Sequence, residues 1–525
     1  MSSSPAGDLG DRYWALRLKK EPKEIPRIHV DEVASQVSSF YERARNIIDY
    51  QEEHLLRKHF IARTLRRRLA LQKKQDAAEP LVKDIVRAGH LSNDAVPETK
   101  IAEVQRIINA YRSIGRALKD KEEMSREMGE WVFKITASAI EECLFPPAAD
   151  ELIAEFMFAS LREGLTVHHK DSMSDDEVSV QLFIAVQKAL LRVDADQLQY
   201  RLLGFIYPDW VEAADSEKGA EVASSLPKVK KMMKNYIQNQ LGAPFLALAN
   251  RYNTVFHLIG DVMASSESQE DLARALRDPQ ELEPRVKIAY QKRFSKEKRR
   301  LRKFALLSVI SFFISKIAVA LAVEIPLEKY FTSSFSATTT AINILFPPLL
   351  MFVIVLFVRM PPQKNRLLVF EEIKKVLFGE GQTYEVVMPR ARLGIGGAVV
   401  RLFYAGLFVA LMFAVSRALF SAGFNIPNII IFVIFTSLVA ATGVRVHNRA
   451  SELSLREKKP TIISFLWDIV VMPFVTIGTW IIRALARFNV VVFLFNMLID
   501  FPLQIFVEFI ENFRDFIRGK KDAMR

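Results

Sequence analysis

The sequence predicts an all-α protein in which a large cytosolic helical-bundle domain is followed by a polytopic α-helical membrane domain. Three observations predict it. The first 291 residues are rich in charge, with apolar residues three and four apart and no alternating β-branched runs that would predict a sheet. Later stretches reach the roughly 20 apolar residues that a helix needs to cross a bilayer. Between them, residues 292–303 (KRFSKEKRRLRK) carry eight Lys or Arg and one Glu.

The net charge of +12 is unevenly distributed along the 525 residues. Residues 1–291 hold 41 basic and 45 acidic side chains, whereas residues 304–525 hold 23 and 14. Because the basic excess lies beside apolar segments, it predicts contact with anionic lipid headgroups and not nucleic-acid binding. The N-terminus has no basic region followed by an apolar core, so we expect no cleaved signal peptide.

The residues before the basic segment predict a tail and a helical domain. Residues 1–27 predict a flexible N-terminal tail, because prolines stand there among small and charged residues. Residues 28–291 predict a cytosolic α-helical domain, in which Asp31 and either Ser174 or Asp175 are expected as N-caps. Its helical patterns cover 29–74, 78–89, 98–120, 122–144, 149–163, 176–191, 195–206 and 227–260. A His- and Asp-rich loop suggests a subdivision near 165–175.

That loop contains the side chains that could hold a metal, namely His168, His169, Asp171, Asp175 and Asp176. Adjacent histidines point in different directions on most backbones, and helix capping explains the aspartates. We therefore expect no metal and no cofactor. The single cysteine, Cys143, excludes a disulfide within the chain, and its apolar neighbours predict a packed side chain instead of a reactive thiol.

Residues 304–444 predict four transmembrane helices with a cytosolic loop, 359–396, between the second and third. That loop holds a helical pattern over Asn365–Phe378. The four apolar segments are Phe304–Val323, Thr340–Val358, Gly397–Ser416 and Asn428–Val444. Connectors 359–396 and 445–460 carry seven and five Lys or Arg, whereas 324–339 and 417–427 carry one each. The positive-inside rule then places the N-terminal domain and the basic loop 445–460 in the cytosol.

Residues 461–499 predict broken apolar segments. Thr461–Ile482 is long enough to cross although Asp468 and Pro473 interrupt it, whereas Phe488–Ile499 is too short to span alone. Either both cross, giving six spans, or the region forms re-entrant or interfacial helices beside four spans. The length of the first segment favours six. Residues 500–525 predict an amphipathic helix with a basic tail, and both topologies leave the C-terminus in the cytosol.

Two sets of candidate site residues follow. Charged residues inside apolar segments are functional suspects by default, so Lys316, Asp468 and Asp500 form a candidate intramembrane polar site. Arg401, near a span end, can extend to the headgroups. Anionic-lipid contact is predicted for Lys292, Arg293, Lys296, Lys298, Arg299, Arg300, Arg302 and Lys303.

Three classes of function remain after the motif search. The sequence contains no nucleophile elbow, phosphate loop, zinc-protease or dinucleotide motif, and the membrane half has a single histidine, His447. An enzyme acting on lipid is therefore disfavoured, and we expect no catalytic residues. The favoured hypothesis is a membrane-anchored helical scaffold or sensor whose cytosolic domain binds a protein partner. The alternative is a channel or secondary transporter with a large cytosolic regulatory domain.

Overall fold

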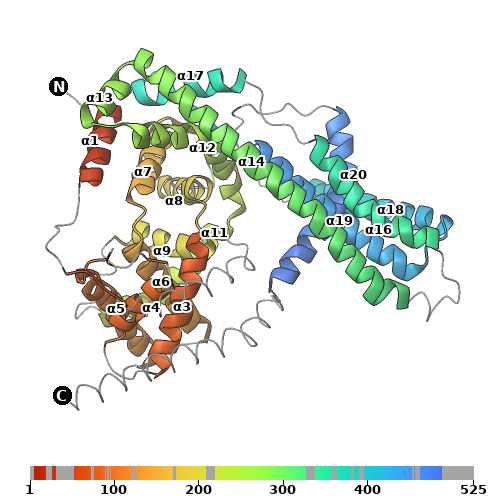
Figure 1. Cartoon of the computed structure of the whole chain (residues 1–525), viewed down its shortest axis with the longest axis horizontal. Helices are drawn as coiled ribbons and strands as arrows, with labels where there is room; N and C mark the ends of the chain where they lie inside the picture. The colour runs from red at the N-terminus through yellow and green to blue at the C-terminus, as the bar shows by residue number, and fades with distance from the viewer. Residues whose placement is uncertain are drawn as a thin grey trace, which may run out of the picture. The chain divides into compact units, whose positions relative to one another are not determined.

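The computed structural model describes residues 5–18, 26–30, 53–71, 76–88, 90–91, 94, 96–120, 126–168, 173–208, 219–326, 337–357, 364–379, 383–388, 395–451, 455 and 462–487. These residues are almost entirely helical (Figure 1). They form two units: the first runs to Asn250 and includes 383–386, and the second contains the other described residues from Arg251 onward. The division lies inside helix α12 and not at the predicted residue 291.

The first unit is a bundle of short helices. Its elements are α1 (Pro5–Leu18), α3 (Glu53–Leu71), α4 (Ala78–Arg87), α5 (Thr99–Asp120), α6 (Arg126–Leu144), α7 (Ala148–Glu163), α8 (Asp175–Val186), the π-helix η1 (Gln187–Leu191), α9 (Ala195–Ile206), α11 (Gly219–Gln238), the 3₁₀ turn η2 (Gln240–Gly242) and the start of α12 (Ala243–Ser265). The predicted helices 98–120, 149–163 and 195–206 are confirmed. Ser174 is the N-cap of α8 and forms a capping box with Glu177.

Two apolar clusters hold this unit together, and α5 and α6 contribute to both. One cluster joins them to α3 and α4 through residues such as Leu65 and Ile85. The other joins them to α8, α9 and α11 through residues such as Ile184, Leu202 and Met233. Because α8 and α9 share a core with α5 and α6, the suggested boundary near 165–175 does not separate two bundles.

Two predictions are wrong: that residues 1–27 form a flexible tail, and that the chain has no sheet. The predicted tail contains α1, which buries Ala6 and Leu9 and pairs Arg12 with Glu155 at 2.6 Å. So small an apolar face gives little helical periodicity. Strands β1 (Leu165–His168) and β2 (Tyr384–Val387) form a two-stranded sheet. Four residues are too few for a clear alternating pattern, and the pairing partner lies far away in the chain.

Two predicted helical patterns also differ from the structure. Residues 26–30 are not helical, and Arg27 forms an isolated antiparallel β-bridge with Pro97. The helix predicted from His29 therefore does not begin there. Asp31 lies outside the described residues. The pattern 227–260 is divided between α11 and α12. A Cβ on Gly242 would overlap the side-chain oxygen of Gln181, so a larger residue in this turn would force the Gln181 side chain to move.

The second unit contains the apolar helices. Its elements are the rest of α12, α13 (Gln269–Arg277), α14 (Pro279–Val319), the π-helix η3 (Ala320–Glu324), α16 (Ala337–Phe357), α17 (Lys364–Phe378), α18 (Ile395–Ser421), α19 (Ile426–Ser451) and α20 (Ile462–Arg487). Three are long and apolar enough to cross a membrane, at Pro279–Glu324, Leu402–Ser421 and Ile426–Asn448. Shorter apolar stretches occupy Ala341–Phe357 and Ile469–Ala484. The predicted segments Phe488–Ile499 and 500–525 lie outside the described residues.

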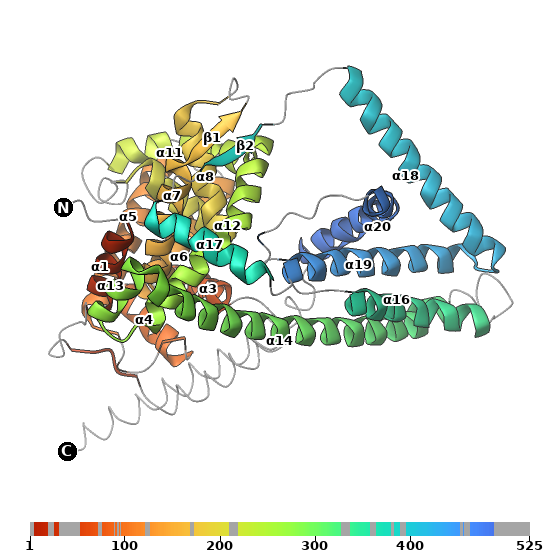
Figure 2. The ribbon, with the colours of Figure 1, turned by 90° about the horizontal axis from the view of Figure 1, so that it is seen from above.

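Helix α14 passes without a break from the basic segment into the first apolar stretch (Figure 2). Asp278 caps its N-terminus by accepting a hydrogen bond from the Gln280 N–H at 2.8 Å, and Pro279 occupies the first turn. From Arg285 to Ile325 the sequence has neither glycine nor proline, so nothing interrupts the helix. The basic segment is therefore a helical part of α14 and not a separate connector.

Helices α14, α16 and α19 pack on one another around Met351, Val439 and Val446. The close approach of α16 and α19 depends on Gly443, where a Cβ would lie 2.9 Å from Ile354. The helix predicted over Asn365–Phe378 is confirmed as α17. Its Asn365 donates to the Tyr290 hydroxyl at 3.2 Å and accepts from the Leu455 N–H at 2.9 Å, which ties α17 to α14.

Candidate functional site

An exposed row of four cations runs along α14 just before its apolar stretch. Spacings of four, three and four residues place these side chains on one face of the helix. The opposite face is apolar: the rings of Tyr290 and Phe294 stack 6.1 Å apart, and Leu301 packs into the apolar core. We call this row the α14 cation stripe; it consists of Lys292, Lys296, Arg299 and Lys303.

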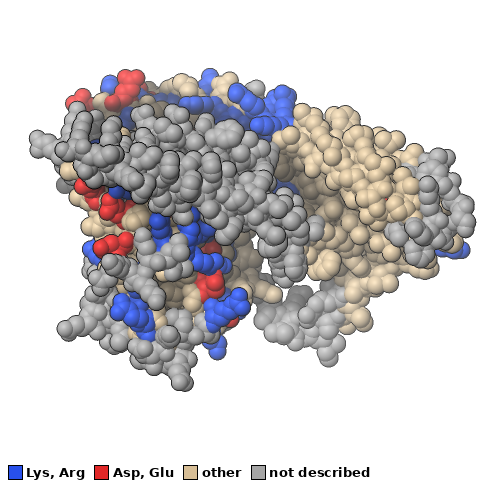
Figure 3. Space-filling model, turned by 60° about the horizontal axis from the view of Figure 1, so that its bottom comes forward, with Lys and Arg blue, Asp and Glu red and all other residues tan. Residues whose placement is uncertain are grey.

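The remaining cations of the segment are not equivalent. Arg293 is half-buried and binds Asp261 of α12 through two nitrogens, at 2.7 and 3.0 Å. It therefore fixes α14 within the second unit, whereas Lys298, Arg300 and Arg302 are exposed like the stripe. Figure 3 shows basic side chains gathered beside a surface almost free of charge.

A second carboxylate clamp precedes the stripe. Arg285 of α14 binds Asp271 of α13 at 2.6 and 2.8 Å. The hydrogen bond from Arg285 outweighs the opposing effect of burial and lowers the pKa of Asp271 to about 2. Together the two clamps hold the start of α14 against α12 and α13.

The apolar part of α14 contains a fully buried ion pair. The Lys316 ammonium binds the Glu324 carboxylate, with side-chain exposures of 0% and 1%. The ammonium also lies 4.8 Å from the centroid of the Phe435 ring on α19. The sequence identified Lys316 but missed Glu324, which stands at the end of the apolar run, where a carboxylate is expected to be solvated.

The π-helix η3 explains how residues eight apart meet. In a regular α-helix the seventh residue returns to nearly the same face, and the eighth is rotated away by about 80°. One extra residue in a π-turn brings Glu324 back above Lys316. Such local π-turns occur frequently at functional sites.

Three more polar side chains are buried among the apolar helices. Asn343 of α16 and Ser437 of α19 are 0% exposed, and Thr436 is 8% exposed. The side-chain polar atoms of all three, and Oε2 of Glu324, have no hydrogen-bond partner among the residues that the structure describes. Buried polar groups without partners are rare in proteins and require an explanation.

The other two members of the predicted intramembrane site are Asp468 and Asp500. Asp468 lies in the second turn of α20, and its side chain is outside the described part. Asp500 also lies outside the described residues. Arg401 directly precedes the apolar stretch Leu402–Ser421, consistent with a position at the end of a span.

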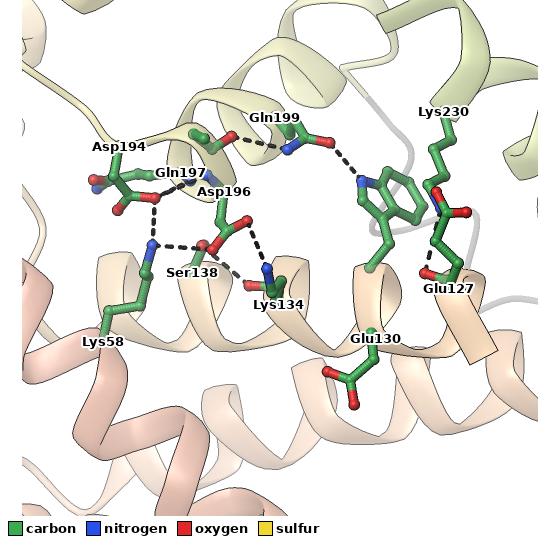
Figure 4. Close-up of polar contacts among 12 residues, drawn as sticks. Lys58, Glu127, Glu130, Lys134, Ser138, Asp194, Asp196, Gln197, Gln199 and Lys230 are labelled. Atoms are coloured by element: carbon green, nitrogen blue, oxygen red, sulfur yellow. Dashed lines mark hydrogen bonds and ion pairs between the residues drawn. The ribbon is translucent and has the colours of Figure 1, made fainter. Parts of the chain in front are cut away.

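The first unit contains its own buried charge network (Figure 4). Lys58 of α3 binds the Asp194 carboxylate and lies 3.6 Å from Asp196, which in turn lies 3.6 Å from Lys134. Asp194 is also the N-cap of α9. Burial raises its pKa, but the Lys58 hydrogen bond and charge and two backbone N–H groups outweigh burial, so the net pKa is lowered.

Two cavities of about 310 and 290 Å³ lie in this unit, and Pro147 lines both. The larger is lined by the carboxylates of Glu103, Glu142 and Glu151 and by the Tyr200 ring. Burial raises the pKa of Glu151 although Arg201 lies 3.2 Å away. Arg201 binds Glu142 and Glu151, Lys100 binds Glu103, and Arg106 also lines the cavity, so its carboxylates are balanced by cations of the chain itself.

No group of three His, Cys, Asp or Glu side chains able to hold a metal ion occurs in the part of the chain that the structure describes. Comparisons with protein-family models, with curated proteins and with solved structures give no match. Any functional statement therefore rests on the geometry of the sites described above.

Proposed function

We propose that the chain is a membrane-anchored helical scaffold or sensor, with its first unit in the cytosol and available to a protein partner. The observation that carries this proposal is the continuity of α14. One helix bears the cation stripe, the clamps to α12 and α13, and an apolar span. An uninterrupted helix is stiff, so a shift or rotation at one of its ends is transmitted to the other end. A flexible linker would not transmit such a movement.

The charge of α14 supports the orientation and the anchoring. The stripe spans twelve residues, a rise of about 16 Å along the helix. Arg299 and Lys303, the two stripe cations nearest the apolar stretch, reach the lipid headgroups if Phe304 enters the hydrocarbon. Each cation near an anionic membrane surface contributes about 1 kcal/mol to membrane binding. The positive-inside rule favours a cytosolic position for these cations and the N-terminus, and four or six spans would return the C-terminus to the same side.

The cavity pair of the first unit is the proposed partner-binding surface. Many charges of this unit are engaged internally: Arg57 with Glu141, Arg68 with Asp84, and Arg201 with Glu142. Arg106 is exposed at the rim of the larger cavity. A partner segment would find the aromatic and apolar face formed by Tyr200 and Pro147 there.

A photo-crosslinking amino acid at Arg106 tests this surface in cells that express the full chain. We expect a discrete crosslinked protein of constant mass. Glu163, exposed near the end of α7 and away from both cavities, is the matched control position and should give none. Equal crosslinking from both positions, or none from Arg106, would contradict the proposal.

The second candidate is a channel or secondary transporter, and the buried Lys316–Glu324 pair is the observation that favours it. Charges within a bilayer are expensive and mark ion or proton pathways. Reconstitution of the full chain in ion-loaded vesicles, with the Glu324→Gln variant beside wild type, tests this function. Flux that depends on Glu324 would replace the scaffold proposal, whereas absence of flux would leave it standing.

A further inference from the structure

We infer that β2 is a releasable strap, which the first unit holds by strand addition to β1 and whose release loosens α7 as far as the cavity pair. The inference concerns the regulation of the proposed partner surface and rests on that proposal for its consequence, but the release itself is measured independently. Three observations carry it: the place of β2 in the chain, its small buried face, and the path from β1 through α7 to the cavities.

The position of β2 in the chain makes it a strap. The strand belongs to the first unit, although the chain on both sides of it belongs to the second. It lies between α17 and α18 in the sequence, and Figure 2 shows it beside β1. Helix α18 begins eight residues after Val387, and a connector of that length spans at most about 28 Å. A displacement of α18 is therefore transmitted to β2 through the chain itself.

Two alternate side chains hold β2 in place. Tyr384 and Val386 are each 2% exposed, whereas Val387 is 61% exposed. The Tyr384 N–H also donates to the Gly164 carbonyl at 2.8 Å. Main-chain hydrogen bonds together with the burial of alternate side chains are the features of strand addition. Because a sheet of two four-residue strands is marginally stable by itself, this contact should open more readily than the helical core.

Strand β1 continues directly from α7. Gly164, whose carbonyl accepts the hydrogen bond from β2, is the C-cap residue of α7. At the other end of α7, Glu151 of the first turn lines the larger cavity and Asp150 lines the smaller one. Helix α7 has 16 residues, about 24 Å of helix, between these two ends. It therefore connects the strap with the proposed partner surface inside a single unit.

The polar contacts of α7 explain why losing the strap would loosen it. Near its C-terminal end, Arg162 donates to the Ser179 hydroxyl at 3.1 Å and lies 3.5 Å from the Asp175 carboxylate. These contacts are partly exposed, and such ion pairs contribute little. At the N-terminal end, Glu151 lies 3.2 Å from Arg201 of α9, so a shift of α7 moves a carboxylate in the wall of the larger cavity.

Hydrogen exchange, measured by mass spectrometry on the purified full chain in detergent, tests the strap. In the wild type, the amides of β1 and β2 should exchange at least about a hundredfold faster than those in the core of α5, yet more slowly than those of an unstructured peptide. Exchange of the sheet as slow as that of α5 would show that β2 is an integral part of the fold and overturn the inference. Exchange at the rate of an unstructured peptide would overturn it as well, because β2 would then not be docked.

A matched pair of variants makes the assignment specific. Val386→Asp places a carboxylate at a buried position and should release the strap, so that β1 exchanges like an unstructured peptide and α7 exchanges several-fold faster, while α5 stays protected. Val387→Asp introduces the same charge at the adjacent exposed position and should behave as wild type. If Val386→Asp does not fold, Val386→Ala replaces it and should raise the exchange of the sheet about tenfold.

Equal exchange in the buried-position and exposed-position variants overturns the inference, and so does an α7 that is unchanged when the sheet opens. The outcome is separate from that of the proposed function. The expected exchange pattern without any crosslinked protein from Arg106 would support the strap and refute only the partner surface.

Discussion

At the scale of single residues, the environment decides what an ionisable group does. Lys58 and Lys316 are both buried and both bind a carboxylate. Lys58 lies in a network with Asp194, Asp196 and backbone donors, typical of a structural charge. Lys316 has one carboxylate and one aromatic ring as its partners, and one oxygen of that carboxylate has no hydrogen-bond partner among the described residues. This difference in the number of partners, and not the extent of burial, distinguishes a structural ion pair from a candidate functional site.

Removing one member of the Lys316–Glu324 pair should cost more stability than removing both. Lys316→Met leaves a buried carboxylate without its ammonium, and breaking such a pair costs about 3–5 kcal/mol. The double variant Lys316→Met/Glu324→Gln removes both charges and should recover most of that loss. Thermal or denaturant unfolding in detergent measures the cycle. Additive losses in the double variant would show that the two side chains do not interact.

The thiol of Cys143 should react slowly in the folded chain. Burial, the largest effect, raises its pKa to about 11, and the Glu103 carboxylate, 3.4 Å from Sγ, also raises it. At pH 8 only about one thiolate in a thousand is then present, and the thiolate is the nucleophile. Alkylation followed by mass spectrometry should be much slower than in guanidinium chloride. Equal rates would mean that Cys143 is exposed.

At the scale of helices, contacts between neighbours fix what the sequence leaves open. The clamp between Asp271 and Arg285 and the contact between α19 and α20 are tertiary contacts, and no local sequence pattern predicts them. A Cβ on Gly478 of α20 would overlap the main-chain oxygen of Ser437. Gly406 of α18 has open space around it. Two glycines in apolar helices therefore have opposite roles.

Gly478→Ala should destabilise the chain, whereas Gly406→Ala should not. The first substitution forces α19 and α20 apart, and overpacking of this kind typically costs about 1–3 kcal/mol. The second improves helix propensity by up to about 1 kcal/mol without a clash. Unfolding temperatures in the same detergent compare them. A Gly478→Ala variant as stable as Gly406→Ala would contradict the close approach of the two helices.

The clamp between α13 and α14 should weaken in acid. Hydrogen bonding to Arg285 lowers the pKa of Asp271 from 3.8 to about 2. A lowered pKa gives stability that is complete above the unfolded value and lost as pH falls through the folded one. The stability gap between wild type and Asp271→Asn should therefore be constant from pH 8 to 5 and close between about pH 4 and 2. Arg285→Gln should give the same profile; a gap unchanged at pH 2 would refute the clamp.

At the scale of the whole chain, the sequence predicts the helical class and several helix boundaries because periodicity and capping are local. Ser174 and Asp194 illustrate this, since each caps a helix within three residues of itself. Partners distant in the chain are not predictable in this way. The β1–β2 pairing, the clamp of Arg293 by Asp261, and the return of Glu324 over Lys316 all depend on tertiary contacts or on a π-turn.

Orientation is a property of the whole chain, and single introduced cysteines can test it. In a Cys143→Ser background, Ala422→Cys places an exposed thiol in the turn between α18 and α19, which carries few basic residues. Glu270→Cys places one on α13, before the cation stripe. Because Lys and Arg are retained on the cytosolic side, an impermeant maleimide should label Ala422→Cys in intact cells and Glu270→Cys only after permeabilisation. Labelling of Glu270→Cys from outside would invert the proposed topology and remove the α14 cation stripe from the anionic cytosolic surface.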